Sequence, residues 1–384
     1  MEWFESASEF AIGPDFRSDT SLEIMYDSPP TDTEQERSMN SKIGEFELIR
    51  QLLEERPGYD PDVLVDAGDD AALVRCRDGV GMLFTCDAQV CGIHFHSDTA
   101  PDAIGRRLAA VNLSDIAAMG GQPRWALFSA MLPAHVDPSY LTLVNRGLLS
   151  ALAVFDTRVI GGNISAVEGP LALELFLVGE VSPQHVMTRR GAAKGELLCI
   201  TGTAGDSAAG LLLLQRGDVV VPEPARSCLV ERHLNPSPRL VEGQILSRSG
   251  NVSACIDVSD GLWQDAGHLA RASQVALRID ASRIPLSASV CEVADPLGVN
   301  PRMLALRGGE DYELLFTVKE QNASDLIAEL ASRTGVSATI IGEVVDGDAG
   351  AVRVVDADGC PLDAVERGFD HLLVNRSSRD GGRA

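Results

Sequence analysis

The sequence predicts an α/β protein built from two domains. Its 384 residues are enough for two hydrophobic cores, and 45% of them are hydrophobic. Short apolar runs with strand character alternate with amphipathic helical segments, and this alternation restarts after Ser182-Pro183. We therefore divide the chain into an acidic, disordered leader (1–42), an N-terminal domain (43–184), a C-terminal domain (185–376) and a disordered tail (377–384).

The first domain begins with an amphipathic helix at Glu45, whose apolar residues share one face. A long helix is predicted from Pro101, a residue that suits the first helical turn, to the Gly120-Gly121 pair. The other elements expected in this domain are a helix at 138–155 and strands at 62–67, 70–76, 80–86, 127–132, 158–160 and 172–181.

The second domain repeats the mixture of strands and helices. Gly202 to Gly210 form a glycine-rich turn into a helix, but no Gly-Lys-Ser/Thr follows, so the turn is not a P-loop. The expected helices are 211–215 and 262–272, and the expected strands are 196–201, 254–257, 277–279, 311–317 and 337–345.

Charge and composition exclude several classes of partner. The formal net charge is -24, from 56 acidic and 32 basic residues, so the surface repels nucleic acid and anionic membranes. A phosphorylated substrate would be repelled too, unless metal ions screened the carboxylates. The chain has no apolar run of about 18 residues and no signal-peptide layout. Its eight cysteines form no CxxC pair, and we expect them to be small buried side chains of a cytoplasmic protein.

Five short acidic motifs stand beside glycines or apolar residues at the predicted ends of strands and helices. Carboxylates that converge in such places repel one another unless cations join them. Oxygen-rich clusters of this kind bind hard divalent metals such as Mg²⁺. The motifs are Gly68-Asp69-Asp70, Cys86-Asp87, Asn112-Leu113-Ser114-Asp115, Asp257-Val258-Ser259-Asp260-Gly261 and Gly308-Gly309-Glu310-Asp311.

Asp115 carries the sharpest single argument. It falls on the stripe of the predicted helix that also contains Ile104, Leu108, Val111 and Met119, so it occupies a position that faces the core. A buried carboxylate without a partner costs several kcal/mol or more, and a partner is therefore expected. A metal ion at the helix end would be such a partner; a helix C-terminal cap or a buried salt bridge would be another.

The other first-domain motifs also have structural alternatives. Gly68-Asp69-Asp70 reads as a turn between two strands, and Thr85-Cys86-Asp87 is predicted to end a strand. Gly161-Gly162-Asn163 follows the short strand 158–160. Two glycines there would let the backbone approach a phosphate or an adenine, although they would equally suit a tight turn.

In the second domain, Asp257 to Gly261 joins a strand to a helix. Ser259 is expected to cap that helix, which would explain one of the two aspartates but not both. Gly308-Gly309 again permits close approach, and Glu310 is placed to meet a ligand group. Among the histidines, His94 is the best candidate for a site, with an ordinary structural role as the alternative.

In order and spacing, these motifs resemble those of the thiamine-monophosphate kinase family. That family lies in the superfamily that includes aminoimidazole ribonucleotide synthetase and selenophosphate synthetase. The runs at 112–120 and 308–314 are specific to the kinase branch. The resemblance covers residues 42–373 and includes Gly68-Asp-Asp-Ala-Ala72, Thr85 to Asp87, Ala110 to Gly120, Gly161-Gly162, Thr188-Arg189, Gly205 to Leu211, Asp257 to Leu262, Gly308 to Phe316 and Gly368-Phe-Asp-His371.

The resemblance implies ATP-dependent phosphorylation of thiamine monophosphate to thiamine diphosphate, by direct transfer on several Mg²⁺ ions and with no covalent catalyst. It implies an N-terminal domain whose strands form a barrel across a homodimer, and a C-terminal α/β domain. The matching positions are Asp70, Thr85, Cys86, Asp87, Asp115, Asn163, Asp257 and Asp260 for metal, Gly162, Asn163, Arg189 and Ser259 for ATP, and His94, Glu310 and Phe369 for thiamine monophosphate.

Two positions depart from the family pattern. Asn163 stands where the family usually has a metal-binding Asp, and Cys86 stands where Thr is common, although its backbone carbonyl is retained. The alternatives are another ATP-dependent enzyme of the superfamily and a nucleotide-binding homologue without catalysis. A selenophosphate synthetase would need a reactive Cys with a nearby Lys in a glycine-rich N-terminal loop, and only Lys42 lies near the start.

Overall fold

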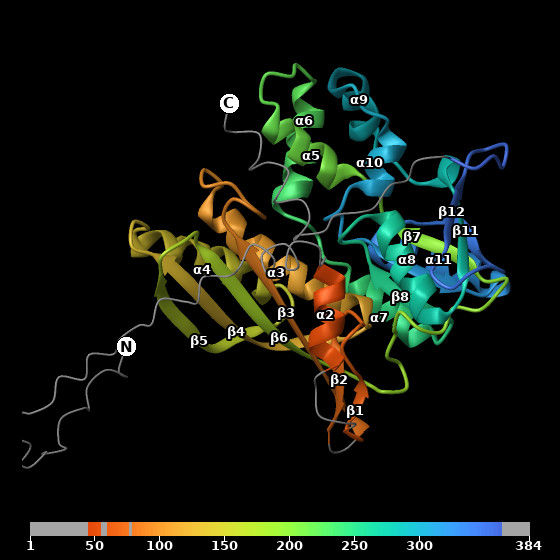
Figure 1. The fold of residues 1–384 in the computed structure, drawn as a ribbon, viewed down its shortest axis with the longest axis horizontal. Helices are drawn as coiled ribbons and strands as arrows, with labels where there is room; N and C mark the ends of the chain where they lie inside the picture. The colour runs from red at the N-terminus through yellow and green to blue at the C-terminus, as the bar shows by residue number, and fades with distance from the viewer. Residues whose placement is uncertain (1–44, 55–59, 77–78, 363–384) are drawn as a thin grey trace, which may run out of the picture.

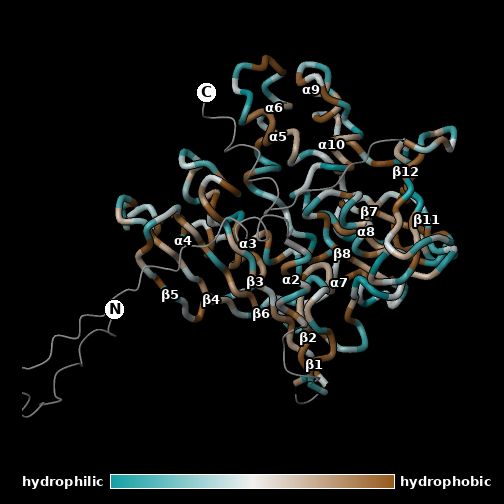
Figure 2. Tube along the Cα trace, viewed as in Figure 1, coloured by the Kyte–Doolittle hydropathy of each residue, from teal (hydrophilic) through white to brown (hydrophobic). Residues whose placement is uncertain are grey.

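The computed structural model describes residues 45–54, 60–76 and 79–362 (Figure 1). These residues form two six-stranded sheets, one in each half of the chain, with helices on their faces. Figure 2 shows hydrophobic residues along the strands of both sheets. Within the described ranges, none of the helices combines the length and the hydropathy that a membrane crossing needs.

The first sheet has the strand order β1-β2-β3-β6-β4-β5 and is antiparallel except for the parallel pair of β4 and β5. Helices α3 and α4 cover one of its faces. The elements of this half are α2 (Glu45–Glu54), β1 (Val63–Val65), β2 (Ala72–Arg75), β3 (Gly81–Val90), α3 (Pro101–Ala118), β4 (Gln122–Pro133), α4 (Pro138–Ala153), β5 (Arg158–Val167) and β6 (Ala172–Val181).

The second sheet has the order β12-β9-β11-β7-β10-β8, with β12 and β9 parallel and the other pairs antiparallel. Its elements, together with the helices around it, are β7 (Leu197–Thr201), α5 (Asp206–Gln215), α6 (Glu223–Leu234), α7 (Leu240–Ser249), β8 (Val252–Asp257), α8 (Leu262–Ser273), β9 (Ala276–Asp280), η2 (Ala281–Arg283), α9 (Ala288–Leu297), α10 (Pro301–Arg307), β10 (Leu314–Val318), α11 (Glu320–Thr334), β11 (Ala338–Val345) and β12 (Val352–Val355).

Helix α3 lies between the two halves and fixes how they meet. It packs on the first sheet, on α4, and on α7 and β8 of the second half. Glycines permit these close crossings: a Cβ on Gly147 of α4 would lie 1.9 Å from the Asp102 carbonyl oxygen, and one on Gly243 of α7 would lie 2.1 Å from that of Ala117. As a result, residues on nearly every face of α3 are buried. A position on the apolar stripe is therefore weaker evidence for a special role of Asp115 than the sequence suggested.

Two predicted strand ends are wrong in a way that matters for the site. β3 continues to Val90, because it pairs with β6 along its whole length, so Thr85, Cys86 and Asp87 lie inside the strand. Likewise β5 continues to Val167 beside β4, so Gly162 and Asn163 belong to a strand and not to a turn after one. The helices α6, α7, α9, α10 and α11 were not predicted.

Two further expectations need correction or restriction. Only Cys199 and Cys255 are buried, whereas Cys76, Cys86, Cys228, Cys291 and Cys360 are exposed, so the expectation of buried cysteines is mostly wrong.

In the described part of one chain, the first sheet is open and ends at β1 and β5. The acidic leader and the C-terminal tail lie outside the described residues.

Candidate active site

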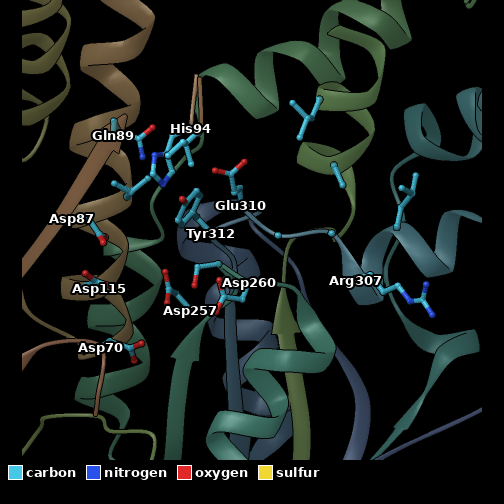
Figure 3. Close-up of a pocket in the computed structure, with 18 of the residues that line it drawn as sticks. Asp70, Asp87, Gln89, His94, Asp115, Asp257, Asp260, Arg307, Glu310 and Tyr312 are labelled. Carbon is cyan, nitrogen blue, oxygen red and sulfur yellow. The ribbon is translucent and has the colours of Figure 1, made fainter. Parts of the chain in front are cut away.

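A cavity of about 880 Å³ lies where the two halves of the chain meet. β3, α3 and the turn that holds His94 line it from the first half, and α5, the end of β8 and the α10 region line it from the second half (Figure 3). One end of the cavity is rich in carboxylates, and we call it the acid end. The other, which we call the apolar end, is lined by Ala208, Leu211, Leu212, Val299, Met303 and Leu304, together with Asn300 and Arg307 of the α10 region.

The acid end joins carboxylates from both halves. Oxygens of Asp70, Asp115 and Asp257 lie within 4.8 Å of one another. They come from the turn before β2, from α3 and from the end of β8, three segments far apart in the sequence. Asp87 and Asp260 line the same end, so the structure brings five predicted aspartates together (Figure 3).

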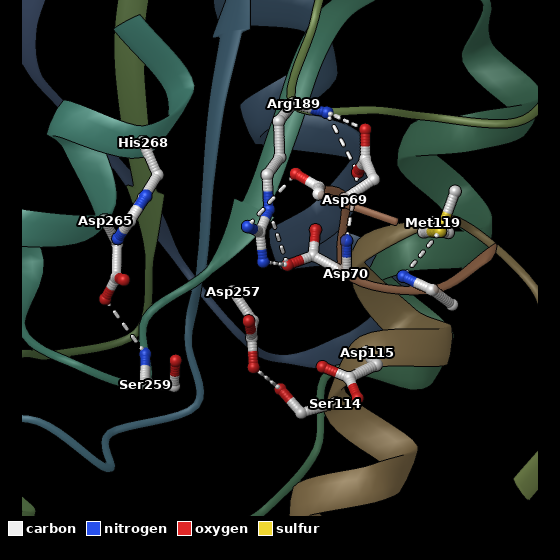
Figure 4. A network of polar contacts seen from close by, with 12 residues as sticks. Asp69, Asp70, Ser114, Asp115, Met119, Arg189, Asp257, Ser259, Asp265 and His268 are labelled. Atoms are coloured by element: carbon white, nitrogen blue, oxygen red, sulfur yellow. Dashed lines mark hydrogen bonds and ion pairs between the residues drawn. The ribbon is translucent and has the colours of Figure 1, made fainter. Parts of the chain in front are cut away.

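Hydroxyl groups and one arginine hold these carboxylates in place. The Ser114 hydroxyl donates to Asp257 at 2.6 Å, and the Thr85 hydroxyl donates to Asp115. Arg189 donates through Nε and Nη2 to the Asp70 Oδ1 atom, at 3.1 and 2.5 Å (Figure 4). Among the described residues, the buried Oδ2 atom of Asp70 has no hydrogen-bond partner.

Burial and mutual repulsion raise the pKa values of this cluster. Burial, followed by repulsion from Asp70, raises the pKa of Asp257 to about 8. The pKa of Asp115 is raised well above its ordinary value by burial and then by Asp87, Asp257 and Asp70. The pKa of Asp70 is also raised by burial, although Arg189 opposes the shift. Without a cation, the cluster therefore disfavours full ionisation near neutral pH.

The donor set fits Mg²⁺. Several carboxylates converge on one point, one of their buried oxygens lacks a partner, and the repulsion among them would be relieved by positive charge. Asp70, Asp115 and Asp257 would hold such an ion, and Asp87 and Asp260 line the same end. Arg189 offsets part of this charge at close range, through its ion pair with Asp70.

Two loops of the second half carry the predicted residues Ser259, Asp260 and Glu310. The loop at 258–261 carries Ser259 and Asp260, and the loop at 308–312 carries Glu310. The Glu310 N–H donates to the Ser259 carbonyl oxygen at 2.7 Å, and a Cβ on Gly309 would lie 2.2 Å from that same oxygen. Glu310 and Tyr312 adopt left-handed φ values of 67° and 52°, a strained conformation that is common at functional sites.

Ser259 does not cap α8 with its side chain, which corrects the prediction. The N-cap of α8 is Gly261, which makes no side-chain cap, and Asp265 in the first turn of the helix instead accepts the backbone N–H of Gly261. Its carboxylate accepts backbone N–H groups from the loop. Sequence reasoning missed Asp265 because an aspartate in a first turn is common without such a contact.

Glu310 is held by a residue that the sequence did not single out. Arg107 of α3 is 2% exposed, and its guanidinium donates to Glu310, to the His233 carbonyl oxygen and to Gln89 at 3.1 Å. Burial opposes ionisation of Glu310, but the charge of Arg107 and its hydrogen bond outweigh burial, so the pKa of Glu310 is lowered. Glu310 thus faces the cavity as an anion.

Four predicted residues have other outcomes. His94 lines the cavity, and its Nδ1 atom accepts the Val90 backbone N–H at 3.0 Å, so the ring is oriented by its own turn. Gly162 and Asn163 do not line the cavity; they lie on β5, where Asn163 is exposed and donates to Ser165 at 2.9 Å. Phe369 lies outside the described residues.

Comparison with known proteins defines the class first. A family model described as AIR synthase related protein, N-terminal domain, matches residues 68–181, and the corresponding C-terminal domain matches residues 193–355. Hydrogenase maturation protein HypE in complex with ATP shares the fold, with a TM-score of 0.62 at 19% identity, over 80% of this chain and 91% of that one.

The particular family follows from closer relatives. The thiamine-monophosphate kinase of Escherichia coli K12 is 38% identical over 331 residues, which are 86% of this chain and 99% of that protein. A structure described as AaThiL complexed with AMPPCP and TMP has a TM-score of 0.73 at 35% identity, over 85% of this chain and 97% of that one. The Stenotrophomonas maltophilia kinase has a TM-score of 0.67 at 34% identity, over 84% and 98%. The chain belongs to the thiamine-monophosphate kinase family.

Proposed function

We propose that this protein transfers the γ-phosphoryl group of ATP to thiamine monophosphate and so forms thiamine diphosphate. The observation that carries the proposal is a cavity with carboxylates at one end and apolar side chains at the other. The chain that forms it is 38% identical to a thiamine-monophosphate kinase over 86% of its own length and 99% of that protein's length. Phosphoryl transfer requires positioning and neutralisation of charge more than covalent chemistry, and the cavity offers both.

At the acid end, the chain's own residues would hold Mg²⁺ and the phosphates. Asp70, Asp87, Asp115, Asp257 and Asp260 would bind metal, together with Thr85 and the backbone carbonyl of Cys86. The bound metal would neutralise the polyphosphate and stabilise charge on the transferred group. Arg189 and Ser259 would contact ATP, and Arg189 reaches the same end from the segment that links the two sheets.

Towards the apolar end, the substrate's rings would leave water against aliphatic side chains. Leu211, Leu212 and Met303 supply this surface, since they line the cavity from α5 and α10. His94 and Glu310 would contact the organic part of thiamine monophosphate, and the anionic Glu310 can accept a hydrogen bond from an amino group. Phe369 is proposed as a further contact, on the family resemblance alone.

We also propose that the working form is a homodimer whose first sheets close into a barrel. The support is the outer face of that sheet, where the large apolar side chains of Trp125, Leu127 and Phe176 are exposed, together with the exposed Ile160 and Ile164 on the edge strand β5. A second copy of the chain would cover this face. Gly162 and Asn163 lie on the same outer strand, so their proposed nucleotide and metal roles depend on the dimer. A cytoplasmic location remains a prediction.

A product assay tests the function directly. The purified protein is incubated with ATP and Mg²⁺ and, in separate reactions, with thiamine monophosphate, thiamine or aminoimidazole precursors, and the products are separated by chromatography. We expect thiamine diphosphate and ADP from thiamine monophosphate only. Activity on unphosphorylated thiamine alone, or on an aminoimidazole precursor, would assign the protein elsewhere in the superfamily. Binding of ATP without any turnover would favour a non-catalytic homologue.

A further inference from the structure

Asp265 is a buried carboxylate that no part of the proposed chemistry uses. It lies in the first turn of α8 and is 2% exposed. One of its oxygens, Oδ2, accepts three consecutive backbone N–H groups, from Ser259 at 3.0 Å, Asp260 at 3.0 Å and Gly261 at 3.1 Å. Figure 4 shows Asp265 pointing back from the helix towards Ser259. One side chain therefore ties the whole loop to the helix that follows it.

The loop has little else to determine its shape on this side. Gly261, the N-cap of α8, adopts a φ of 115° and has no side chain with which to cap the helix. The first N–H groups of a helix need acceptors, which an N-cap side chain usually supplies. Asp265 does not replace such a cap: from inside the helix it accepts the N–H groups of Ser259, Asp260 and Gly261, which precede the first turn. Removing its carboxylate would leave three buried or half-buried N–H groups without that acceptor.

The opposite side of the loop is tied to the segment that carries Glu310. The Ser259 carbonyl oxygen accepts the Glu310 N–H, and the Val258 carbonyl oxygen accepts the Tyr312 N–H at 2.9 Å. The Asp260 carboxylate itself accepts from Gln264 Nε2 at 2.9 Å. Asp265 thus acts on one side of a loop whose other side is already fixed, so it decides how far Ser259 and Asp260 reach towards the acid end.

We propose that Asp265 is a positioning residue for the metal and nucleotide half of the site. It holds the 259–261 loop so that Asp260 and Ser259 meet Mg²⁺ and the ATP phosphates, while it touches neither. The proposal rests on the function proposed above. A misplacement of about 1 Å in such a loop is enough to lower turnover about 100-fold.

Asp260, Asp265 and His268 also have the composition of a metal site, since one ligand atom from each lies within 4.8 Å of the others. The contacts favour positioning over ligation. The Oδ2 atom of Asp265 already faces three amide hydrogens, which would repel a cation at that oxygen. The His268 Nδ1 atom lies 3.4 Å from the Arg271 guanidinium, so a positive group stands beside this ring nitrogen and disfavours a cation there.

The test compares Asp265→Asn and Asp265→Ala with a matched control, Asp311→Asn. Asp311 is an equally buried aspartate whose carboxylate accepts the N–H groups of Gly205 and Ser207 at the start of α5, at 2.6 and 3.1 Å. That helix lines the apolar end. Each variant is assayed for kcat and for the KM values of MgATP and thiamine monophosphate, and its thermal unfolding is measured.

We expect Asp265→Asn to lower kcat/KM for MgATP by about 10-fold or more, the effect of losing a residue that orients a ligand. Asp265→Ala should lower it further, because Asn keeps one acceptor oxygen. The KM for thiamine monophosphate should stay within about 2-fold, whereas Asp311→Asn should change it most. If the melting temperature falls in both Asn variants, this shared loss of stability cannot explain why one variant affects MgATP and the other affects thiamine monophosphate.

Three results would overturn the proposal. The first is an unchanged kcat/KM for MgATP in both Asp265 variants, and the second is failure of both variants to fold. A third would be loss of one bound Mn²⁺ with an unchanged KM for MgATP, which would make Asp265 a metal ligand. The affinity for MgAMPPCP, measured by calorimetry, keeps the test separate from the proposed reaction. If the wild type does not phosphorylate thiamine monophosphate, the function fails, but a roughly 10-fold weaker affinity in Asp265→Asn would still support the positioning role.

Discussion

The two ends of the cavity are built in different ways. The acid end takes its carboxylates from both domains, with Asp70 and Asp115 on one side and Asp257 on the other, so it exists only where α3 meets β8. The apolar end comes from α5 and the α10 region of the second domain, as Leu211 and Met303 illustrate. The charged half of the site therefore depends on how the domains meet, whereas the apolar half is made within one domain.

This difference separates two functions that a kinase for a small organic phosphate must combine. Both of its reactants are anionic at the reacting groups, so the acid end requires cations before it can accept them. The organic part of the substrate gains from removal of apolar surface from water, which needs shape and little charge. If the two ends are independent, substitutions at one end should impair its function and leave that of the other end nearly unchanged.

The largest effect is expected from Asp115→Asn at the acid end. Loss of one charge from the cluster should lower kcat by about 100-fold or more, because a ligand contributes more than the residues that orient it. The KM for thiamine monophosphate should change by less than about 3-fold, since the apolar end is untouched. Steady-state kinetics with separate titrations of each substrate provide the measurement.

The matched control for Asp115 is Asp206→Asn, a buried aspartate outside the cavity that accepts hydrogen bonds from Thr203 and Ser287. It should lose stability but keep turnover within about 3-fold of wild type. Near-normal turnover in Asp115→Asn would mean that Asp115 has a structural role at the helix end and is not a ligand.

Arg107→Met should produce the next largest effect, at the junction of the two ends. Glu310 would lose the guanidinium that keeps it ionised and oriented, so we expect the KM for thiamine monophosphate to rise about 10-fold. The KM for MgATP should hardly change. Arg107→Lys, which keeps the charge but not the planar fork, should recover part of the loss. A rise in both KM values by the same factor would indicate general disruption of the domain contact.

Met303→Ala should have a smaller effect, confined to the apolar end. Loss of apolar contact with the substrate should raise the KM for thiamine monophosphate about 5- to 10-fold and leave kcat and the KM for MgATP within about 2-fold. Met187→Ala is the control, because Met187 is buried outside the cavity. If both variants raise the same KM, the change reflects core stability and the apolar end does not bind substrate.

The smallest expected effect concerns stability and pH. In metal-free protein, burial and Asp70 raise the pKa of Asp257 to about 8, and burial raises that of Asp69 to about 6, from a value of 3.8. Between pH 4 and 8 the folded state therefore binds more protons than the unfolded state, and stability falls as pH rises. Mg²⁺ requires the ionised carboxylates, so its stabilising effect should grow with pH.

Melting temperatures with EDTA and with Mg²⁺, at pH 6 and pH 8, check this expectation. The shift caused by Mg²⁺ should be larger at pH 8 by about 3 °C or more. The variant Asp257→Asn removes the carboxylate whose pKa is raised further of the two, and it should therefore reduce the pH dependence of stability. Equal shifts at both pH values would show that Mg²⁺ does not replace protons in this cluster.

The sequence predicted the acid end much better than the apolar end. Asp70, Asp115 and Asp257 could be recognised because a carboxylate among apolar residues is unusual wherever it occurs. Leu211 and Met303 look like any core residue, and only the packing of α5 against α10 turns them towards a cavity. β6 was predicted with its observed bounds, since its apolar run is bounded by clear turn residues.

Other features depended on contacts that no local pattern contains. β3 and β5 extend past their predicted ends because β6 and β4 offer backbone partners, which overrides the glycines and polar residues at those positions. Arg107 matters because it donates to a backbone carbonyl far away in the sequence, that of His233. Asp265 matters because it accepts backbone N–H groups that are aligned in one loop. Asn163 stays on an exposed strand, so its role depends on whether a second chain meets that strand.

The central claim is that the acid end binds divalent metal between carboxylates of both domains. Crystals grown with Mn²⁺ and a non-hydrolysable ATP analogue test it most directly, by anomalous scattering at the manganese edge. We predict peaks between Asp115 of the first domain and Asp257 of the second, with the phosphates of the analogue beside them. Phosphates bound in the cavity without any manganese peak among these carboxylates would contradict the claim.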